Sequence, residues 1–224
     1  FRSYEERNLG LDNAMDGVRV VAKPLSGLTF KGVIGKQRYY WEEIWKTDNG
    51  LVRGLDAEFS FNELIPCLGN KPTRITLGGS FVSVYEKAET KFVTIEEGDY
   101  KMQIPENIGA GAVRLDLSHK AFNLSAEYAR KSQDPNAVNG YIYRNGEALL
   151  VKAGYSIKGF AVSLEAKRID NMSFKSKRSE TGNMLNVNYL PAITRQHAYS
   201  LMAMYPYATQ VNGEMGLQAD VMYK

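Results

Sequence analysis

Residues 112–130 read AVRLDLSHKAFNLSAEYAR, and apolar and polar side chains alternate along them with a period of two. In the first arm the apolar positions run from Val113 to Leu117, and charged or hydroxyl residues fill the positions between them. After a short turn at 119–121 the alternation resumes and continues to Tyr128. Because successive side chains of a strand point to opposite faces, this stretch predicts an antiparallel hairpin with one apolar and one polar face.

The same two-faced unit returns at residues 148–169, with its turn at Lys158 and Gly159. One helical turn is expected within 63–68, and a small hairpin within the long connection 88–109. Counting the arms of the two units, the chain holds about eleven candidate strands, and we predict an all-β antiparallel fold. The other candidate strands are 18–23, 28–40, 55–61, 73–87, 184–190, 198–205 and 214–224.

The composition excludes several classes of site. No linker divides the 224 residues, so one domain is the simplest interpretation. The formal charge of +3 gives no reason to expect a nucleic-acid partner. Cys67 is the one cysteine, and with only His119 and His197 beside it a Cys/His zinc site has too few ligands. We expect no metal and no cofactor.

Catalytic motifs are also missing. The run Gly-Ala-Gly-Ala at 109–112 begins like a dinucleotide-binding fingerprint, but Arg114 stands at the third glycine position and a strand follows where a helix is required. Neither the Ser118-His119 pair nor His197 has an evident triad partner. An enzyme therefore ranks behind the other functions, and we predict that the protein is not one.

The lengths of the connections indicate a membrane location. No run of about 18 apolar residues is present, as a transmembrane helix requires, but a membrane barrel needs strands of only about 9–11 residues. Short connections such as 24–27 and 119–121 alternate with longer, charged ones, 62–72 being an exception. Outer-membrane barrels have short periplasmic turns and long extracellular loops. We therefore predict an outer-membrane β-barrel over residues 18–224, with a soluble β-sandwich binding module or jelly roll as the alternative.

Charged residues in mid-strand predict which face meets lipid. A Lys or Arg at the bilayer midplane costs about 2–4 kcal/mol, so these residues must face a polar lumen while their apolar neighbours, such as Leu115 and Leu164, face lipid. Tyrosines near strand ends, such as Tyr85 and Tyr155, suit the aromatic girdles of such barrels. The predicted lumen-lining residues are Asp56, Glu58, Arg114, Asp116, Glu127, Glu165 and Lys167.

Residues 1–17 show no clean period and combine dense charge with turn formers, so we expect a loop that can fold into the lumen. There its charged residues would pair with those of the barrel wall and restrict flow. Its candidate residues are Arg2, Tyr4, Glu5, Glu6, Arg7, Asp12 and Asn13.

Three further stretches read FRSYEERNLGLDNAMDGVRV at 1–20, LTFKGVIGKQRY at 28–39 and GLVRGLD at 50–56. Together they resemble a family of Bacteroidota outer-membrane β-barrel proteins that is catalogued as a domain of unknown function. The resemblance is distinctive over about residues 1–61. It implies that the chain is the C-terminal part of a larger barrel, incomplete by itself, and it carries no activity and no functional residues over.

Two functions of different class follow from these expectations. The first is a porin-like channel or transport pore with a polar, charged lumen in the bacterial outer membrane. The second is a structural or accessory subunit of an outer-membrane complex with a plugged lumen. The expected partners are outer-membrane lipid and lipopolysaccharide, and for the second function other outer-membrane proteins. Lys175, Lys177 and Arg178 could meet lipopolysaccharide phosphates, although a solvated loop is the simpler interpretation.

Overall fold

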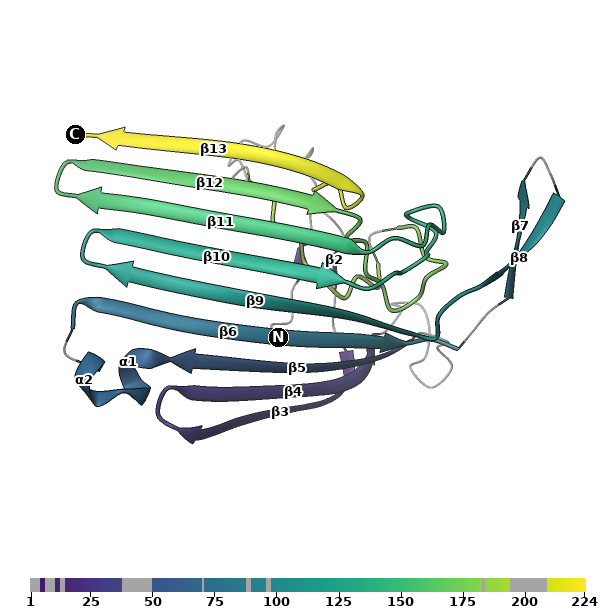
Figure 1. Ribbon diagram of the computed structural model, residues 1–224, viewed down its shortest axis with the longest axis horizontal. Coiled ribbons are helices and arrows are strands. Elements are labelled where there is room, and N and C mark those ends of the chain that lie inside the picture. The colour runs from purple at the N-terminus through teal and green to yellow at the C-terminus, as the bar shows by residue number, and fades with distance from the viewer. Residues whose placement is uncertain are drawn as a thin grey trace.

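The computed structural model describes residues 5–6, 11–12, 15–37, 50–69, 71–87, 90–95, 98–182, 184–193 and 209–224 (Figure 1). Within these residues, nine strands form one antiparallel sheet in the order β13-β12-β11-β10-β9-β6-β5-β4-β3. The strands are β3 (Met15–Leu25), β4 (Leu28–Gln37), β5 (Leu51–Ser60), β6 (Thr73–Tyr85), β9 (Asn107–His119), β10 (Phe122–Lys131), β11 (Gly146–Ile157), β12 (Phe160–Asp170) and β13 (Gly213–Tyr223).

The two predicted hairpins are confirmed. In β9 and β10, Val113 lies opposite Tyr128 and Leu117 opposite Leu124, so the apolar side chains of both arms share one face. β11 and β12 pair in the same way from Glu147 to Ile157. The period of two therefore sets the register across the whole sheet, because a slip by one residue would turn every apolar side chain to the opposite face.

Short turns and long connections lie at opposite ends of the sheet (Figure 1). At the short end, the turns are made by Gly27 (φ 80°), Lys120 (φ 52°) and Gly159 (φ 83°), because tight hairpin turns need left-handed backbone. The helices α1 (Phe61–Leu64) and α2 (Pro66–Gly69) join β5 to β6 at this end. No helix among the described residues is long and apolar enough to cross a membrane.

Two small sheets stand apart from the main one. β7 (Thr90–Ile95) pairs with β8 (Gly98–Gln103), which confirms the small hairpin expected within the connection from β6 to β9. β1 (Glu5–Glu6) pairs with β2 (Leu11–Asp12), and β3 begins at Met15. Residues 1–17 are therefore not all loop.

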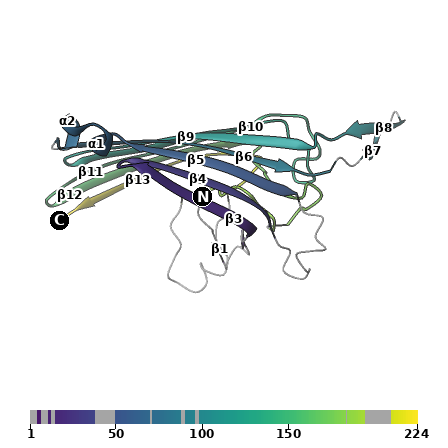
Figure 2. The ribbon, with the colours of Figure 1, turned by 90° about the horizontal axis from the view of Figure 1, so that it is seen from below.

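The sheet is arched (Figure 2), and its two faces carry unlike side chains. We call the face that carries Asp56 and Arg114 the inner face and the opposite one the outer face. The buried hydrophobic cluster lies on the inner face at the end with long connections, where Val52, Val84 and Ile108 of three strands meet Phe174. Phe174 belongs to residues 171–193, which we call the cap segment.

One expectation about the sheet agrees with the structure and one is corrected. The described strands form an open sheet with edges at β3 and β13, as expected for strands that do not close into a barrel by themselves. Residues 184–190 do not form a strand of this sheet, because Asn186 makes only an isolated bridge to Lys175 within the cap segment. The expected strand 198–205 lies outside the described residues.

Candidate functional site

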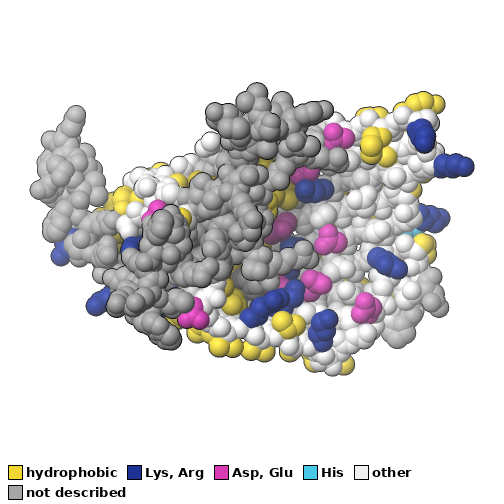
Figure 3. All heavy atoms as spheres, turned by 180° about the vertical axis from the view of Figure 1, so that it is seen from behind, with side chains coloured by type: hydrophobic (Ala, Val, Ile, Leu, Met, Phe, Trp, Pro, Cys, Tyr) yellow, Lys and Arg dark blue, Asp and Glu magenta, His cyan; other side chains and the backbone are white. Residues whose placement is uncertain are grey.

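The inner face carries charged side chains on neighbouring strands. Register places Asp56 opposite Lys31 and Ser80, Arg114 opposite Glu127, and Lys152 opposite Glu165. All seven residues expected to line a lumen therefore share this face. Figure 3 shows Lys and Arg side chains interspersed with Asp and Glu over the part of it that lies toward the short turns.

Asp56 is the centre of an ion-pair group on this face. Its side chain is only 1% exposed, and its carboxylate lies 3.1 Å from Lys31 Nζ and 2.6 Å from Arg114 Nη2. Ser80 donates a hydrogen bond of 2.9 Å to the same carboxylate. A Cβ atom at Gly78 would lie 2.7 Å from Arg114 Nη2, so glycine leaves the space through which the guanidinium crosses β6. Lys31, Arg114 and Ser80 together compensate the charge of the Asp56 carboxylate, which burial has removed from water.

A second pair group joins β11, β12 and β13. Lys152 Nζ lies 2.6 Å from Glu165 Oε1, and Lys167 Nζ lies 2.6 Å from Glu214 Oε1. Lys167 also donates to the carbonyl of Pro191 at 3.1 Å. The ammonium group of Lys167 thus contacts both the sheet and the cap segment.

The other three predicted lumen-lining residues make fewer contacts. Glu58 lies 3.8 Å from Lys31 and is 42% exposed. Asp116 and Glu127 are exposed on the inner face, and within the described part of the chain neither makes an ion pair or a side-chain hydrogen bond. Of the motif at 1–17, Glu5, Glu6 and Asp12 lie in the small sheet, whereas Arg2, Tyr4, Arg7 and Asn13 lie outside the described residues.

The outer face is apolar, and no element that the structure describes covers it. Large hydrophobic side chains are exposed on it along the whole sheet, from Val20 on β3 through Leu55 and Val113 to Leu217 on β13. Leu55 is 67% exposed and Leu217 79% exposed. Exposed apolar patches of this extent mark contact with a partner or with lipid.

The cap segment covers the inner face at the end with long connections. It forms a small hairpin, in which Ser176 donates to the Leu185 carbonyl at 3.0 Å and Val187 to the Phe174 carbonyl at 2.8 Å. The hairpin is bonded to the sheet, because Gly50 donates to the Ser176 carbonyl at 2.8 Å. A Cβ atom at Gly50 would lie 2.4 Å from that oxygen, so the close approach requires glycine.

Buried cations fix the cap segment to the sheet. Lys131, at the end of β10, pairs with Asp134 at 3.1 Å and donates to the Ser173 carbonyl. Arg178 lies 3.5 Å from Glu86 and 3.9 Å from Asp134. Burial lowers the pKa of Arg178, and the carboxylates of Glu86 and Asp134 oppose that shift. Such buried ion pairs stabilise the fold mainly because each partner compensates a charge that is already buried.

Lys175 is buried as well. Its ammonium group donates to the Met184 carbonyl at 2.7 Å and to the Gly182 carbonyl. Burial lowers its pKa to about 8, although the charge of Glu180 acts in the opposite direction. The expectation that Lys175 and Arg178 lie in a solvated loop is therefore wrong, since both hold the cap segment together.

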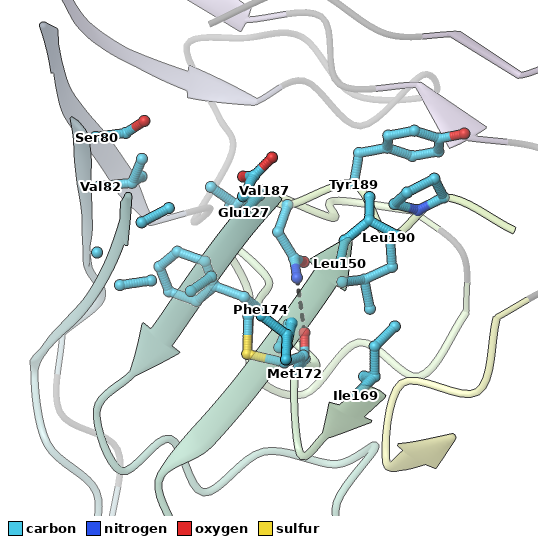
Figure 4. A pocket seen from close by; sticks show the side chains of 18 of the residues that line it. Ser80, Val82, Glu127, Leu150, Ile169, Met172, Phe174, Val187, Tyr189 and Leu190 are labelled. Carbon is cyan, nitrogen blue, oxygen red and sulfur yellow. Dashed lines mark hydrogen bonds between the residues drawn. The ribbon is translucent and has the colours of Figure 1, made fainter. Parts of the chain in front are cut away.

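A cavity of about 550 Å³ separates the cap segment from the sheet (Figure 4). Its lining is mainly apolar, with Glu127 and Lys167 among the polar residues. Among the residues that the structure describes, no group of three or more His, Cys, Asp or Glu side chains could hold a metal ion. Sequence reasoning missed this cavity and the buried pairs beside it, because no local pattern links β10 to the cap segment.

Comparison with known proteins assigns the chain to a family. A family of unknown function, DUF6029, matches residues 1–224. The chain belongs to DUF6029. No curated protein and no solved structure matches this DUF6029 chain. Family membership therefore adds no activity, and the physical features of the two faces are what bear on its function.

Proposed function

We propose that this DUF6029 chain forms part of the wall of a bacterial outer-membrane β-barrel, with the outer face in lipid and the inner face lining a polar lumen. The observation that carries the proposal is the contrast between the faces across the whole sheet. Apolar side chains are exposed on one face, whereas paired charges occupy the other. In a soluble sandwich the apolar face would be covered by a second layer, and no described element covers it.

Three further features support this proposal. The main strands are 10–13 residues long, enough to span a bilayer when tilted. Exposed tyrosines lie toward both ends of the outer face, with Tyr85 and Tyr128 toward the long connections and Tyr155 and Tyr223 toward the short turns. Short turns and long connections at opposite ends are typical of such barrels. The Bacteroidota outer membrane as the location rests on the resemblance described above, and lipopolysaccharide as a partner follows from that location.

In this proposal the open edges are paired. Unpaired backbone groups cost several kcal/mol each in hydrocarbon, so β3 and β13 would have to bond to further strands. The cap segment would then stand inside the lumen near its extracellular mouth and narrow it. The function that follows is a channel with a restricted mouth.

The orientation of the faces can be tested by cysteine labelling in lipid vesicles. With Cys67→Ser as background, cysteines would replace Leu55 and Val113 on the outer face and Asp116 and Ser163 on the inner face. All four positions are exposed in the structure. A water-soluble maleimide should modify the inner pair and spare the outer pair. Equal modification of all four would contradict a membrane wall.

The alternative is a structural subunit with a closed lumen. It is favoured by the burial of the cap segment, where Phe174 is 2% exposed and Ser176 fully buried. Planar bilayer recordings of the whole protein distinguish the two. Stepwise conductance that rises in a Phe174→Ser variant supports the channel, whereas no conductance in either protein supports the subunit.

A further inference from the structure

The floor of the cavity is made of alanines. Ala112, Ala129 and Ala148 lie opposite one another on β9, β10 and β11, in a single row across the inner face. The row on the side of the short turns carries Arg114, Glu127 and other larger side chains. Three adjacent methyl groups therefore hollow the sheet surface at this row, and the cap segment does not fill the hollow.

The roof is contributed by the cap segment. Met172, Phe174 and Val187 lie over the cavity in Figure 4. Asn188 donates a hydrogen bond of 2.8 Å to the Met172 carbonyl, which ties the two arms of the cap segment together. The roof therefore consists of two arms that are hydrogen-bonded to each other, and the hairpin they form is bonded to the sheet. The shape of the cavity does not depend on a single side chain.

The charged side chains at the cavity differ in their partners. Lys167 lies 2.6 Å from Glu214, and Arg114 donates its bonds to Asp56 and Ser80. Glu127, in contrast, has no hydrogen bond or ion pair among the described residues. The hydrogen bonds of the nearby cations thus go to other groups, and Arg114 acts on Glu127 only through its charge. Glu127 is therefore a carboxylate that lines the cavity without a direct partner among the described residues.

We propose that this cavity binds a small amphipathic molecule with an apolar body and one cationic amine, the body lying between the alanine floor and the cap segment and the amine on Glu127. The volume lies in the range of about 300–1,000 Å³ that is usual for small-molecule sites. An amine would supply the donors and the positive charge that Glu127 lacks, and a charge-assisted hydrogen bond is the strongest that one carboxylate can make to a ligand.

This inference goes beyond the proposed function, because it concerns occupancy of a cavity and holds whether or not a lumen conducts. Its probe is dansylcadaverine, which joins an apolar fluorophore to a primary amine. Its N-acetylated form keeps the body and removes the charge. The full-length protein in phosphatidylcholine nanodiscs would be titrated with each dye, and emission from protein-free nanodiscs subtracted.

The amine should bind saturably at one site with a blue-shifted emission, and at least about tenfold more tightly than the acetylated form. Glu127→Gln should remove that preference by weakening the binding of the amine about tenfold. Glu147→Gln, the same change at an exposed position of β11 outside the cavity, should leave the affinity unchanged. Ala129→Phe fills the hollow and should abolish binding of both dyes.

Ala148→Leu repeats the filling test with a smaller side chain, and it decides the result if Ala129→Phe does not fold. Far-ultraviolet circular dichroism and the urea midpoint identify the folded variants. Undiminished binding to a folded filled variant would overturn the site. Equal affinity of Glu127→Gln and the wild-type protein for the amine would overturn the role of Glu127, as would equal binding of the two dyes.

Discussion

Arg114 Nη2 lies 2.6 Å from Asp56 Oδ1, although the two residues are 58 positions apart and their strands are not neighbours. The guanidinium crosses β6 above Gly78, and Ser80 of that strand bonds to both partners. The pair therefore joins three strands on the inner face. These contacts compensate the negative charge of Asp56, whose side chain is almost fully buried.

Asp56→Asn should destabilise the protein by about 3–5 kcal/mol, because it leaves Arg114 and Lys31 without their buried partner. Glu58→Gln on the same strand is the matched control. Glu58 is 42% exposed and 3.8 Å from Lys31, and loss of such a pair should cost less than about 1 kcal/mol. Urea unfolding of the protein in phospholipid vesicles measures both. Equal effects of the two variants would contradict the central role of Asp56.

Val113→Arg distinguishes a lipid-facing surface from a solvated one. Val113 is 55% exposed in the middle of β9. In water such a substitution changes stability by less than about 0.5 kcal/mol, whereas in the bilayer midplane it costs about 2–4 kcal/mol. Ser125→Arg, on the inner face of β10, is the control and should cost little in either environment. A neutral Val113→Arg in vesicles would argue against the proposed membrane wall.

Phe174→Ala should loosen the cap segment without unfolding the sheet. Removing a buried aromatic side chain costs about 3–5 kcal/mol, and Phe174 packs against Val52, Val84 and Ile108 from a segment outside the sheet. Hydrogen exchange should therefore accelerate in residues 172–190 and stay unchanged in β9 and β10. Ile142→Ala, at a position 54% exposed, is the control and should change neither. Acceleration throughout the sheet would show that the cap segment and the sheet unfold together.

The burial of Lys175 should make stability rise with pH. Its pKa in the folded protein is about 8, below the ordinary value of 10.5. Between these values the unfolded chain binds a proton that the folded protein does not, so the free energy of unfolding increases as pH rises through this window. The urea midpoint measured from pH 7 to pH 10 should show this rise.

Lys175→Met should lack that increment of stability between pH 8 and 10. Lys177→Met, two positions away, should retain it. If the wild-type and Lys175→Met proteins had parallel pH profiles, Lys175 would not be the group responsible.

The alternation of side chains determined much of this fold from the sequence alone. The patterns at 112–130 and 148–169 specified both hairpins and their faces, because a slip of one residue in register would turn every apolar side chain to the opposite face. The same rule placed all seven predicted charged residues, from Asp56 to Lys167, on one face. Positions of left-handed backbone at Gly27 and Gly159 coincide with predicted short turns, since glycine marks them locally.

The cap segment and its cavity were decided by the tertiary structure. Residues 171–193 have no usable period, and they are fixed by contacts such as those of Lys131 with Ser173 and of Gly50 with Ser176, which join residues far apart in the chain. Lys175 and Arg178 look like solvated loop residues because their burial depends on contacts that form only on folding. Lys175 bonds to the Met184 carbonyl across the hairpin of the cap segment, and Arg178 lies 3.5 Å from Glu86 of another segment. The sequence alone determines which face a side chain takes along a strand, and only the folded chain determines what covers that face.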